Sequence, residues 1–335
     1  MSSKLIDSKW RRDTTKARGS LAPQLFDLDL WKELEQIKLK RFVVATCNWE
    51  YLLEHTNCLV AYEKSAIGIP LLCGIYSEDE SKRENRQNNL KLQEELGLKK
   101  VILFSFGCPT LDWIQQQQSD SEIRNDYLIN YIRCARFTVM RTIWSALGLN
   151  KHNLLLNQAA SYIIDLDNVV KADFDSTIAR LYGNKKIILS WNSRQSPSKN
   201  FPATLSGMTL TKDGKLNTSY ATNHPYKILK AGFCAFSPCN LSNIMLHLVE
   251  LYSIGDNVSM IYLRLFTFYF SDQVAMLLSL KDIKETMQYE YQDSIKWIDI
   301  SESKIVNLDN EKAQQIWYPK GVGIANKQKT LTTPN

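Results

Sequence analysis

The strongest constraint on the fold of this chain is an alternation of apolar runs and helical segments in its first half. Three short apolar runs, each bounded by polar residues, occur at residues 42–46, 71–76 and 101–106. Helix-forming stretches lie between them at residues 50–60 and 81–96, and Gly97 follows the second as a helix-ending residue. Runs that are apolar throughout are typical of strands buried on both faces, and their alternation with helices predicts a parallel sheet.

The same pattern continues beyond residue 120. Apolar residues recur three or four apart over residues 122–147, which predicts a long helix that ends at Gly148. Further strands, a hairpin and helices are expected at residues 159–165, 187–191, 209–216, 240–253, 272–280 and 295–299. The predicted fold class is therefore α/β, with a Rossmann-like, mostly parallel central sheet, helices on both faces and a smaller mixed β region in the second half.

Length and composition fit one large α/β domain or two small ones. The chain has 335 residues, of which 44% are hydrophobic and 23% are charged. We expect a basic arm at residues 1–20, a single domain at residues 21–325 and a polar tail at residues 326–335. Within the domain, residues 40–191 are expected to form one half and residues 192–325 the other.

The sequence predicts a soluble protein with reduced thiols. It contains no stretch of 18 or more uninterrupted apolar residues and no apolar core of a secretory signal near its start. We therefore expect a cytoplasmic protein, at most peripheral at the inner face of a membrane. Seven cysteines, an odd number, agree with this. We interpret the basic N-terminal arm as a solvated tail. Contact of the arm with an anionic membrane surface or with nucleic acid is an open alternative.

The main chemical feature is a pair of carboxylates, Asp165 and Asp167, at the end of a buried strand. Residues two apart in an extended chain point the same way, and open α/β sheets bind ligands at the carboxyl ends of their strands. Two like charges held close together are costly unless a cation lies between them. Because Mn²⁺ and Mg²⁺ take carboxylate oxygens together with substrate phosphates, the pair predicts a divalent metal site for a diphosphate.

The sequence around this pair resembles a known family. Residues 161–170, SYIIDLDNVV, are similar to the metal-binding stretch of the GT-A nucleotide-sugar glycosyltransferases, loosely of the glycogenin-like type, in which an apolar strand ends in Asp-x-Asp. Three further features agree with that family in their order along the chain. They are residues 43–48 with Tyr51, the helix that carries Arg133, Arg136 and Arg141, and residues 231–236 followed by Asp272-Gln273.

The resemblance implies a GT-A fold and an enzyme, a hexosyltransferase-like glycosyltransferase. It would move a sugar from a nucleotide-diphosphate sugar to a cell-surface glycan, a lipid-linked saccharide or another acceptor. A UDP-sugar is the expected donor. The metal would bind Asp165 and Asp167, and the catalytic residues would be Asp272 and Gln273, as a general base or a partner of the sugar. The donor would contact Thr46, Cys47, Asn48, Tyr51, Arg136, Asp165, Leu166, Asp167 and Lys320. The acceptor or sugar side would include Trp191, Ala231, Gly232 and Phe233.

The chain departs from the glycogenin-like branch in its histidines. That branch has a C-terminal histidine that completes the metal shell, whereas the histidines here are His55, His152, His224 and His247. The sequence therefore does not identify the third protein ligand of the metal. Because the branch of the family is also not assigned, the sequence does not identify the donor sugar. Two assignments also have simpler alternatives: Lys320 fits a solvated turn, and Asp272 fits a residue that caps its helix.

Several enzyme classes lack their motifs in this chain. It has no P-loop, no Gly-x-Gly-x-x-Gly after the first strand and no Gly-x-Ser-x-Gly. Three alternatives to a glycan-directed transferase remain. They are a GT-A transferase that modifies nucleic acid or protein, a sugar nucleotidyltransferase, and a catalytically inactive GT-A relative that acts as a binding protein.

Overall fold

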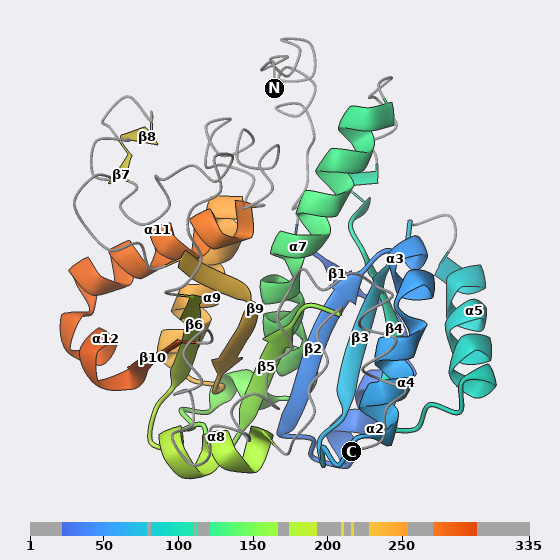
Figure 1. Cartoon of the computed structure of the whole chain (residues 1–335), viewed down its shortest axis with the longest axis horizontal. Coiled ribbons are helices and arrows are strands. Elements are labelled where there is room, and N and C mark those ends of the chain that lie inside the picture. Colours follow the sequence, from blue (N-terminus) through green and yellow to red (C-terminus); the bar gives the residue numbers. More distant parts are fainter. Residues whose placement is uncertain are drawn as a thin grey trace.

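A central eight-stranded sheet with helices on both faces organises the molecule (Figure 1). The computed structural model describes residues 22–78, 82–109, 111–112, 121–166, 174–192, 209–210, 216–217, 228–253 and 271–299. The sheet order is β1-β4-β3-β2-β5-β9-β6-β10. Its strands are β1 (Gln24–Leu25), β2 (Arg41–Cys47), β3 (Leu71–Tyr76), β4 (Val101–Gly107), β5 (Ala160–Ile164), β6 (Ile187–Asn192), β9 (Ile228–Phe236) and β10 (Ile295–Asp299).

The sheet is mixed but mostly parallel, as predicted. Strands β4, β3, β2 and β5 pair in parallel, and so do β6 and β10. Strand β9 runs antiparallel between β5 and β6, and β1 runs antiparallel along the edge of β4. The α/β class is therefore confirmed, and the antiparallel β9 makes the second half of the sheet mixed.

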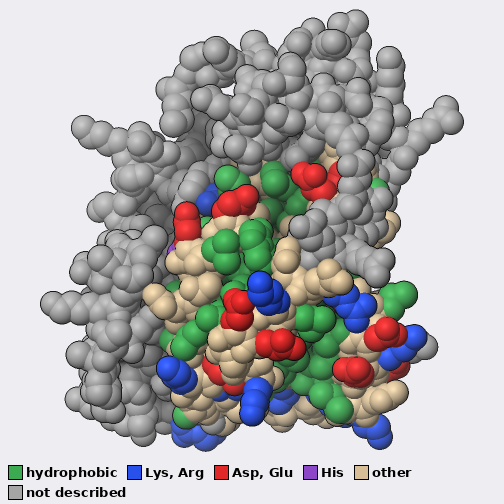
Figure 2. Space-filling view, turned by 90° about the vertical axis from the view of Figure 1, so that its right-hand side faces the viewer, with side chains coloured by type: hydrophobic (Ala, Val, Ile, Leu, Met, Phe, Trp, Pro, Cys, Tyr) green, Lys and Arg blue, Asp and Glu red, His purple; other side chains and the backbone are tan. Residues whose placement is uncertain are grey.

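Helices cover the two faces in two separate cores. One core is covered by α2 (Leu28–Gln36), α7 (Ser121–Ala146), α9 (Asn240–Ser253) and α11 (Ser271–Thr286). The other is covered by α3 (Trp49–Glu54), α4 (Thr56–Lys64), α5 (Lys82–Glu95) and α8 (Phe174–Tyr182). Two further short elements are η2 (Leu149–Lys151) and α12 (Gln288–Ser294). On the side of the molecule that Figure 2 shows, acidic and basic side chains are interspersed.

Side chains of the strands alternate between these cores. In β2, Phe42 and Val44 lie in the core under α7, whereas Val43 and Ala45 lie in the core under α3 and α4. This burial on both faces explains why the strand reads as one continuous apolar run.

Most element boundaries agree with the sequence, and a few differ. The expected hairpin is present as β7 (Thr209–Leu210) paired antiparallel with β8 (Leu216–Asn217). Gly97 and Gly148 follow α5 and α7 with φ of 63° and 66°, which glycine adopts readily. The single helix expected at residues 50–60 is wrong: α3 and α4 are separate helices, and His55 lies between them.

The strand order reverses between β2 and β5. After β4 the chain returns through α7 to the other side of β2, where β5 pairs from Ala160 opposite Arg41 to Ile163 opposite Val44. The ends of the two strands extend beyond this ladder. In open α/β sheets such a switch point is where ligands bind, at the carboxyl ends of the strands.

The N-terminal arm and the polar tail lie outside the described residues, and the predicted division into two halves stays a prediction. No helix within the described ranges is long and apolar enough to cross a membrane.

Candidate active site at the switch point of the sheet

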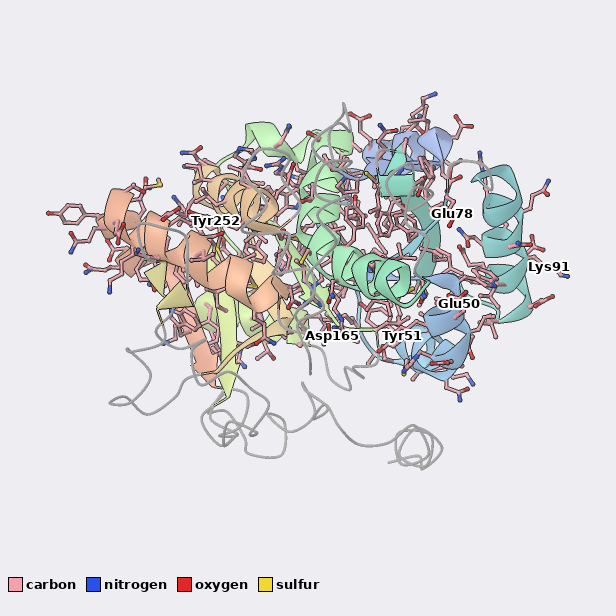
Figure 3. All side chains as sticks on the ribbon, turned by 90° about the horizontal axis from the view of Figure 1, so that it is seen from above. Glu50, Tyr51, Glu78, Lys91, Asp165 and Tyr252 are labelled. Atoms are coloured by element: carbon pink, nitrogen blue, oxygen red, sulfur yellow. The ribbon has the colours of Figure 1, made fainter. Side chains whose placement is uncertain are left out.

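Asp165 lies directly after β5, at the switch point. Its backbone N–H donates to the carbonyl of Gly232 in β9, at 3.2 Å, which fixes the turn after the strand. Its side chain is 15% exposed, so it borders the surface without being freely solvated. Figure 3, the view from above, shows Asp165 near the middle of the molecule, with Tyr51 on the side of α3.

Arg136, on α7, forms ion pairs with two carboxylates. Its Nη1 donates to Oδ1 of Asp165 at 2.5 Å, and its Nη2 donates to Oδ2 of Asp272, in the first turn of α11. The side chains of Arg136 and Asp272 are 5% and 7% exposed. Three segments that are remote in sequence therefore meet in one largely buried cluster, which we call the Arg136 cluster.

The Arg136 cluster carries a net negative charge. Burial alone lowers the pKa of Arg136, but the carboxylates of Asp165 and Asp272 more than offset this and raise it above its ordinary value. Burial also raises the pKa of the neighbouring Cys234 thiol to about 12, so that the thiol is neutral. Two carboxylates and one guanidinium then give a net charge of −1. A further cation is electrostatically favoured beside such a cluster.

Asp165 fits the chemistry of a divalent metal ligand, although it does not complete a site. It offers hard carboxylate oxygens and is more exposed than Asp272. Within the part of the chain that the structure describes, there is no group of three or more His, Cys, Asp or Glu residues that could hold a metal ion. Asp167 lies outside the described residues, so the predicted pairing of the two carboxylates stays a prediction.

The residues predicted to contact the nucleoside lie at the end of β2. Thr46 is half-buried, and its hydroxyl donates to the carbonyl of Ile132 on α7 at 3.0 Å. Asn48 caps α3, because its side-chain oxygen accepts a bond from the backbone N–H of Tyr51 at 3.1 Å. Tyr51 is 37% exposed, and its ring stacks on His55. Of these residues, Tyr51 is the most exposed to solvent.

Three other predicted contact residues have buried side chains. Cys47 packs in the core under α3, with its Sγ 4.0 Å from Sγ of Cys73. Leu166 and Phe233 lie in the same core, and Phe233 contacts the rings of Tyr162 and Phe174. Any contact of these residues with a ligand would therefore come from backbone atoms.

The remaining predicted residues are placed only in part. The Gly232 carbonyl accepts the Asp165 bond, and the backbone N–H of Gln273 donates to Oδ1 of Asp272 at 2.8 Å. Ala231 and Trp191 belong to β9 and β6, but their side chains are outside the described part, as is the whole of Lys320.

The sequence did not predict the partners of Arg136, which was expected to reach a phosphate or the sugar. The indication available in the sequence was the apolar run around Arg136, because an arginine inside such a run is expected to be buried, and a buried guanidinium requires carboxylate partners. His55 was also missed as a neighbour of the site. The sequence indicated this neighbour through spacing, because residues four apart on a helix, such as Tyr51 and His55, lie on the same face.

Comparison with solved structures finds glycosyltransferases, as the sequence resemblance led us to expect. The chain is similar to the galactosyltransferase LgtC in complex with donor and acceptor sugar analogues, with 10% identity and a TM-score of 0.40 over 88% of this chain and 97% of LgtC. It is also similar to the bifunctional glycosyltransferase WbbM, with 15% identity and a TM-score of 0.38 over 72% of this chain. For the glycosyltransferase GlyE of Streptococcus pneumoniae TIGR4, the identity is 12% and the TM-score is 0.35 over 80% of this chain.

The chain spans only 37% of WbbM and 46% of GlyE. No protein-family model matches the chain, and no curated protein matches it in sequence. With TM-scores of 0.40 and below, the donor, the acceptor and the reaction have to be inferred from the chain's own residues.

Proposed function

We propose that the chain is a metal-dependent glycosyltransferase that moves a sugar from a nucleotide-diphosphate sugar to an acceptor hydroxyl. The observation that supports this most is the Arg136 cluster. It joins a carboxylate at the end of β5 to a carboxylate in the first turn of α11, at the point where the strand order reverses. In this proposal, Asp165 at the end of β5 binds the metal and the donor. Asp272 on α11 lies beside the donor sugar or the acceptor.

Asp165 is proposed to hold the metal and the donor, together with Asp167. When bound, Mn²⁺ or Mg²⁺ would stabilise the charge that develops on the diphosphate leaving group. The net charge of −1 on the Arg136 cluster favours such a cation, while the Arg136 guanidinium keeps Asp165 in one orientation. The Nε of Arg136 is buried and has no hydrogen-bond partner among the described residues, so an oxygen of a bound ligand would satisfy it.

Asp272 is proposed to orient a hydroxyl of the donor sugar or of the acceptor. One of its oxygens accepts a bond from Arg136 and the other from the backbone of Gln273. A carboxylate oxygen can accept more than one hydrogen bond, so each retains capacity for a hydroxyl donor. Asp272 is held in the first turn of α11 by its pair with Arg136 of α7, and this fixed position would supply the alignment that group transfer requires.

Donor and acceptor classes follow the sequence resemblance. We propose a UDP-sugar as the first donor to test and a cell-surface glycan or lipid-linked saccharide as the acceptor. A cytoplasmic location agrees with this, since nucleotide sugars and the inner face of the membrane would both be accessible there.

A thermal-shift screen tests the donor class. UDP-, GDP-, CMP- and dTDP-sugars would be tested with Mn²⁺, and a bound donor should raise Tm by mass action. Asp165→Asn should remove the Mn²⁺-dependent part of the shift. The control is Asp29→Asn, because that carboxylate is 71% exposed on α2. A panel without any shift in the wild type would contradict the proposed function.

A further inference from the structure

His55 contacts Tyr51 at two points. The two rings are stacked, with centroids 4.1 Å apart and planes inclined by 22°. In addition, Nδ1 of His55 lies 2.9 Å from the backbone carbonyl of Tyr51. Because a carbonyl only accepts hydrogen bonds, Nδ1 carries the proton and donates it.

The hydrogen bond compensates for the way in which α3 ends. The backbone N–H of His55 donates to Leu52 rather than to Tyr51, so the usual helical donor for the Tyr51 carbonyl is used elsewhere. The imidazole supplies a donor in its place. One side chain thus satisfies the backbone of Tyr51 and supports its ring.

The two residues differ strongly in exposure. His55 is 7% exposed, whereas Tyr51 is 37% exposed. The histidine is therefore the buried layer and the tyrosine the outer layer of the stack. An exposed ring without support would sample several rotamers and would lose that freedom when it binds a ligand. A supported ring is already fixed.

The stack stands at the switch point of the sheet. Asn48 directly follows β2 and caps α3 by accepting the bond from the N–H of Tyr51, which ties Tyr51 to the end of the strand. Strands β2 and β5 pair in parallel, so Tyr51 and Asp165 follow strand ends at the same edge of the sheet, and they project beside each other in the view from above (Figure 3). The Tyr51 stack and the Asp165 carboxylate therefore follow two adjacent strands of the sheet.

We propose that His55 is a positioning residue, which holds the Tyr51 ring as a preformed stacking surface for the base of the bound nucleotide. This inference rests on the proposed function, since the base belongs to the sugar-nucleotide donor. A base stacks on an aromatic ring through its π-face, whatever its hydrogen-bonding edge. His55 acts only through Tyr51 and does not touch the ligand.

Two substitutions separate the two contacts of His55. His55→Phe keeps a stacked ring and removes the donor, whereas His55→Asn keeps a donor near Nδ1 and removes the ring. Dissociation constants of UDP, GDP, CMP and dTDP would be measured by calorimetry with Mn²⁺, and the tightest of these nucleotides would serve for all variants. His247→Asn is the matched control, because His247 is exposed on α9.

The expected result has three parts. Tyr51→Ala should weaken binding by about 5-fold or more, the lower end for loss of a base–aromatic stack. His55→Asn should weaken it by about 3- to 10-fold, as for loss of an aromatic pair, and His55→Phe by less than His55→Asn. In the Tyr51→Ala background, His55→Asn should change the dissociation constant by less than about 2-fold, because the two residues act as a unit.

Two outcomes would overturn the inference. If His55→Asn weakens binding by the same factor with and without Tyr51, His55 acts by another route. If it leaves the wild-type affinity unchanged, it positions nothing. In both cases nucleotide binding itself would still support the proposed function. If no nucleotide binds the wild type, the proposed function and the inference fail together.

Discussion

Arg136 and Asp272 form a buried ion pair that joins α7 to the first turn of α11. The same guanidinium pairs with Asp165 at 2.5 Å, so one side chain connects the end of β5 with the segment that carries the predicted catalytic residues. Its removal would leave two carboxylates in a poorly solvated place without their counter-charge.

Arg136→Met should therefore lower the free energy of unfolding by about 3–5 kcal/mol, the usual effect of removing one partner of a buried pair. Urea denaturation followed by circular dichroism measures this. Lys91→Met on α5 is the control, because Lys91 and its partner Glu95 are 75% and 59% exposed. The control should lose about 1 kcal/mol or less. Equal losses in the two variants would contradict the burial argument.

Asp272→Asn should separate catalysis from donor binding. The amide keeps the size of the carboxylate and an oxygen that can still accept the bond from Gln273, but it removes the negative charge opposite Arg136. We expect kcat to fall by about 100-fold or more, since alignment in the transition state is lost. The dissociation constant of the donor should change much less. Steady-state kinetics combined with calorimetry would show this, and an unchanged kcat would exclude Asp272 from the reaction.

The free energy of unfolding should decline at alkaline pH, because a buried tyrosine hydroxyl and a buried thiol lose their protons more readily in the unfolded chain than in the fold. Burial, together with the Asp175 carboxylate, raises the pKa of Tyr162 well above its ordinary 10.0. Burial raises the pKa of Cys234 from 9.0 to about 12. A raised pKa stabilises the fold fully below the unfolded value, and the contribution is lost as pH rises through the folded value.

The free energy of unfolding should therefore fall increasingly as pH rises above 9.0 and then 10.0. Tyr162→Phe should start from a lower stability at neutral pH, because its hydroxyl donates to Asp175 at 2.5 Å. The variant should also lose less on further alkalinisation, since one titrating group is gone. Urea titrations from pH 7 to pH 11 would show this, and parallel curves for the two proteins would contradict it.

All seven cysteines are free and buried. Native protein should consequently react slowly with 5,5′-dithiobis(2-nitrobenzoate) at pH 8, since access of the reagent to the buried thiols is limited. Addition of guanidinium chloride should release the full seven equivalents. Fewer equivalents in denaturant would show that some thiols are oxidised, contrary to the structure.

The fold was largely predictable because the parallel strands are buried on both faces. Strands such as β3 are apolar throughout, and Gly97 marks the end of the intervening helix without ambiguity. The break between α3 and α4 was not predictable, because residues on both sides of His55 favour helix. It depends on a local change of hydrogen bonding, in which the His55 N–H donates to Leu52.

The position of Asp165 at the carboxyl end of β5 was predictable, whereas its partner was not. A carboxylate directly after a buried strand lies at the carboxyl edge of a parallel sheet by geometry alone. The pairing of Arg136 with Asp272 depends on how α7 packs against α11, which no local pattern encodes. For Asn48, the structure assigns a cap on α3, and a ligand contact would come in addition.

The central claim is that Asp165 serves a metal-dependent transfer from a sugar nucleotide. Its most direct test is the release of nucleoside diphosphate from the sugar nucleotide that stabilises the protein best, measured with Mn²⁺, with EDTA and with Asp165→Asn. We predict turnover by the wild type that EDTA abolishes and that Asp165→Asn lowers by about 100-fold or more, as expected for the loss of a group that stabilises the transition state. Equal turnover by Asp165→Asn and the wild type, or turnover that EDTA does not affect, would contradict the claim.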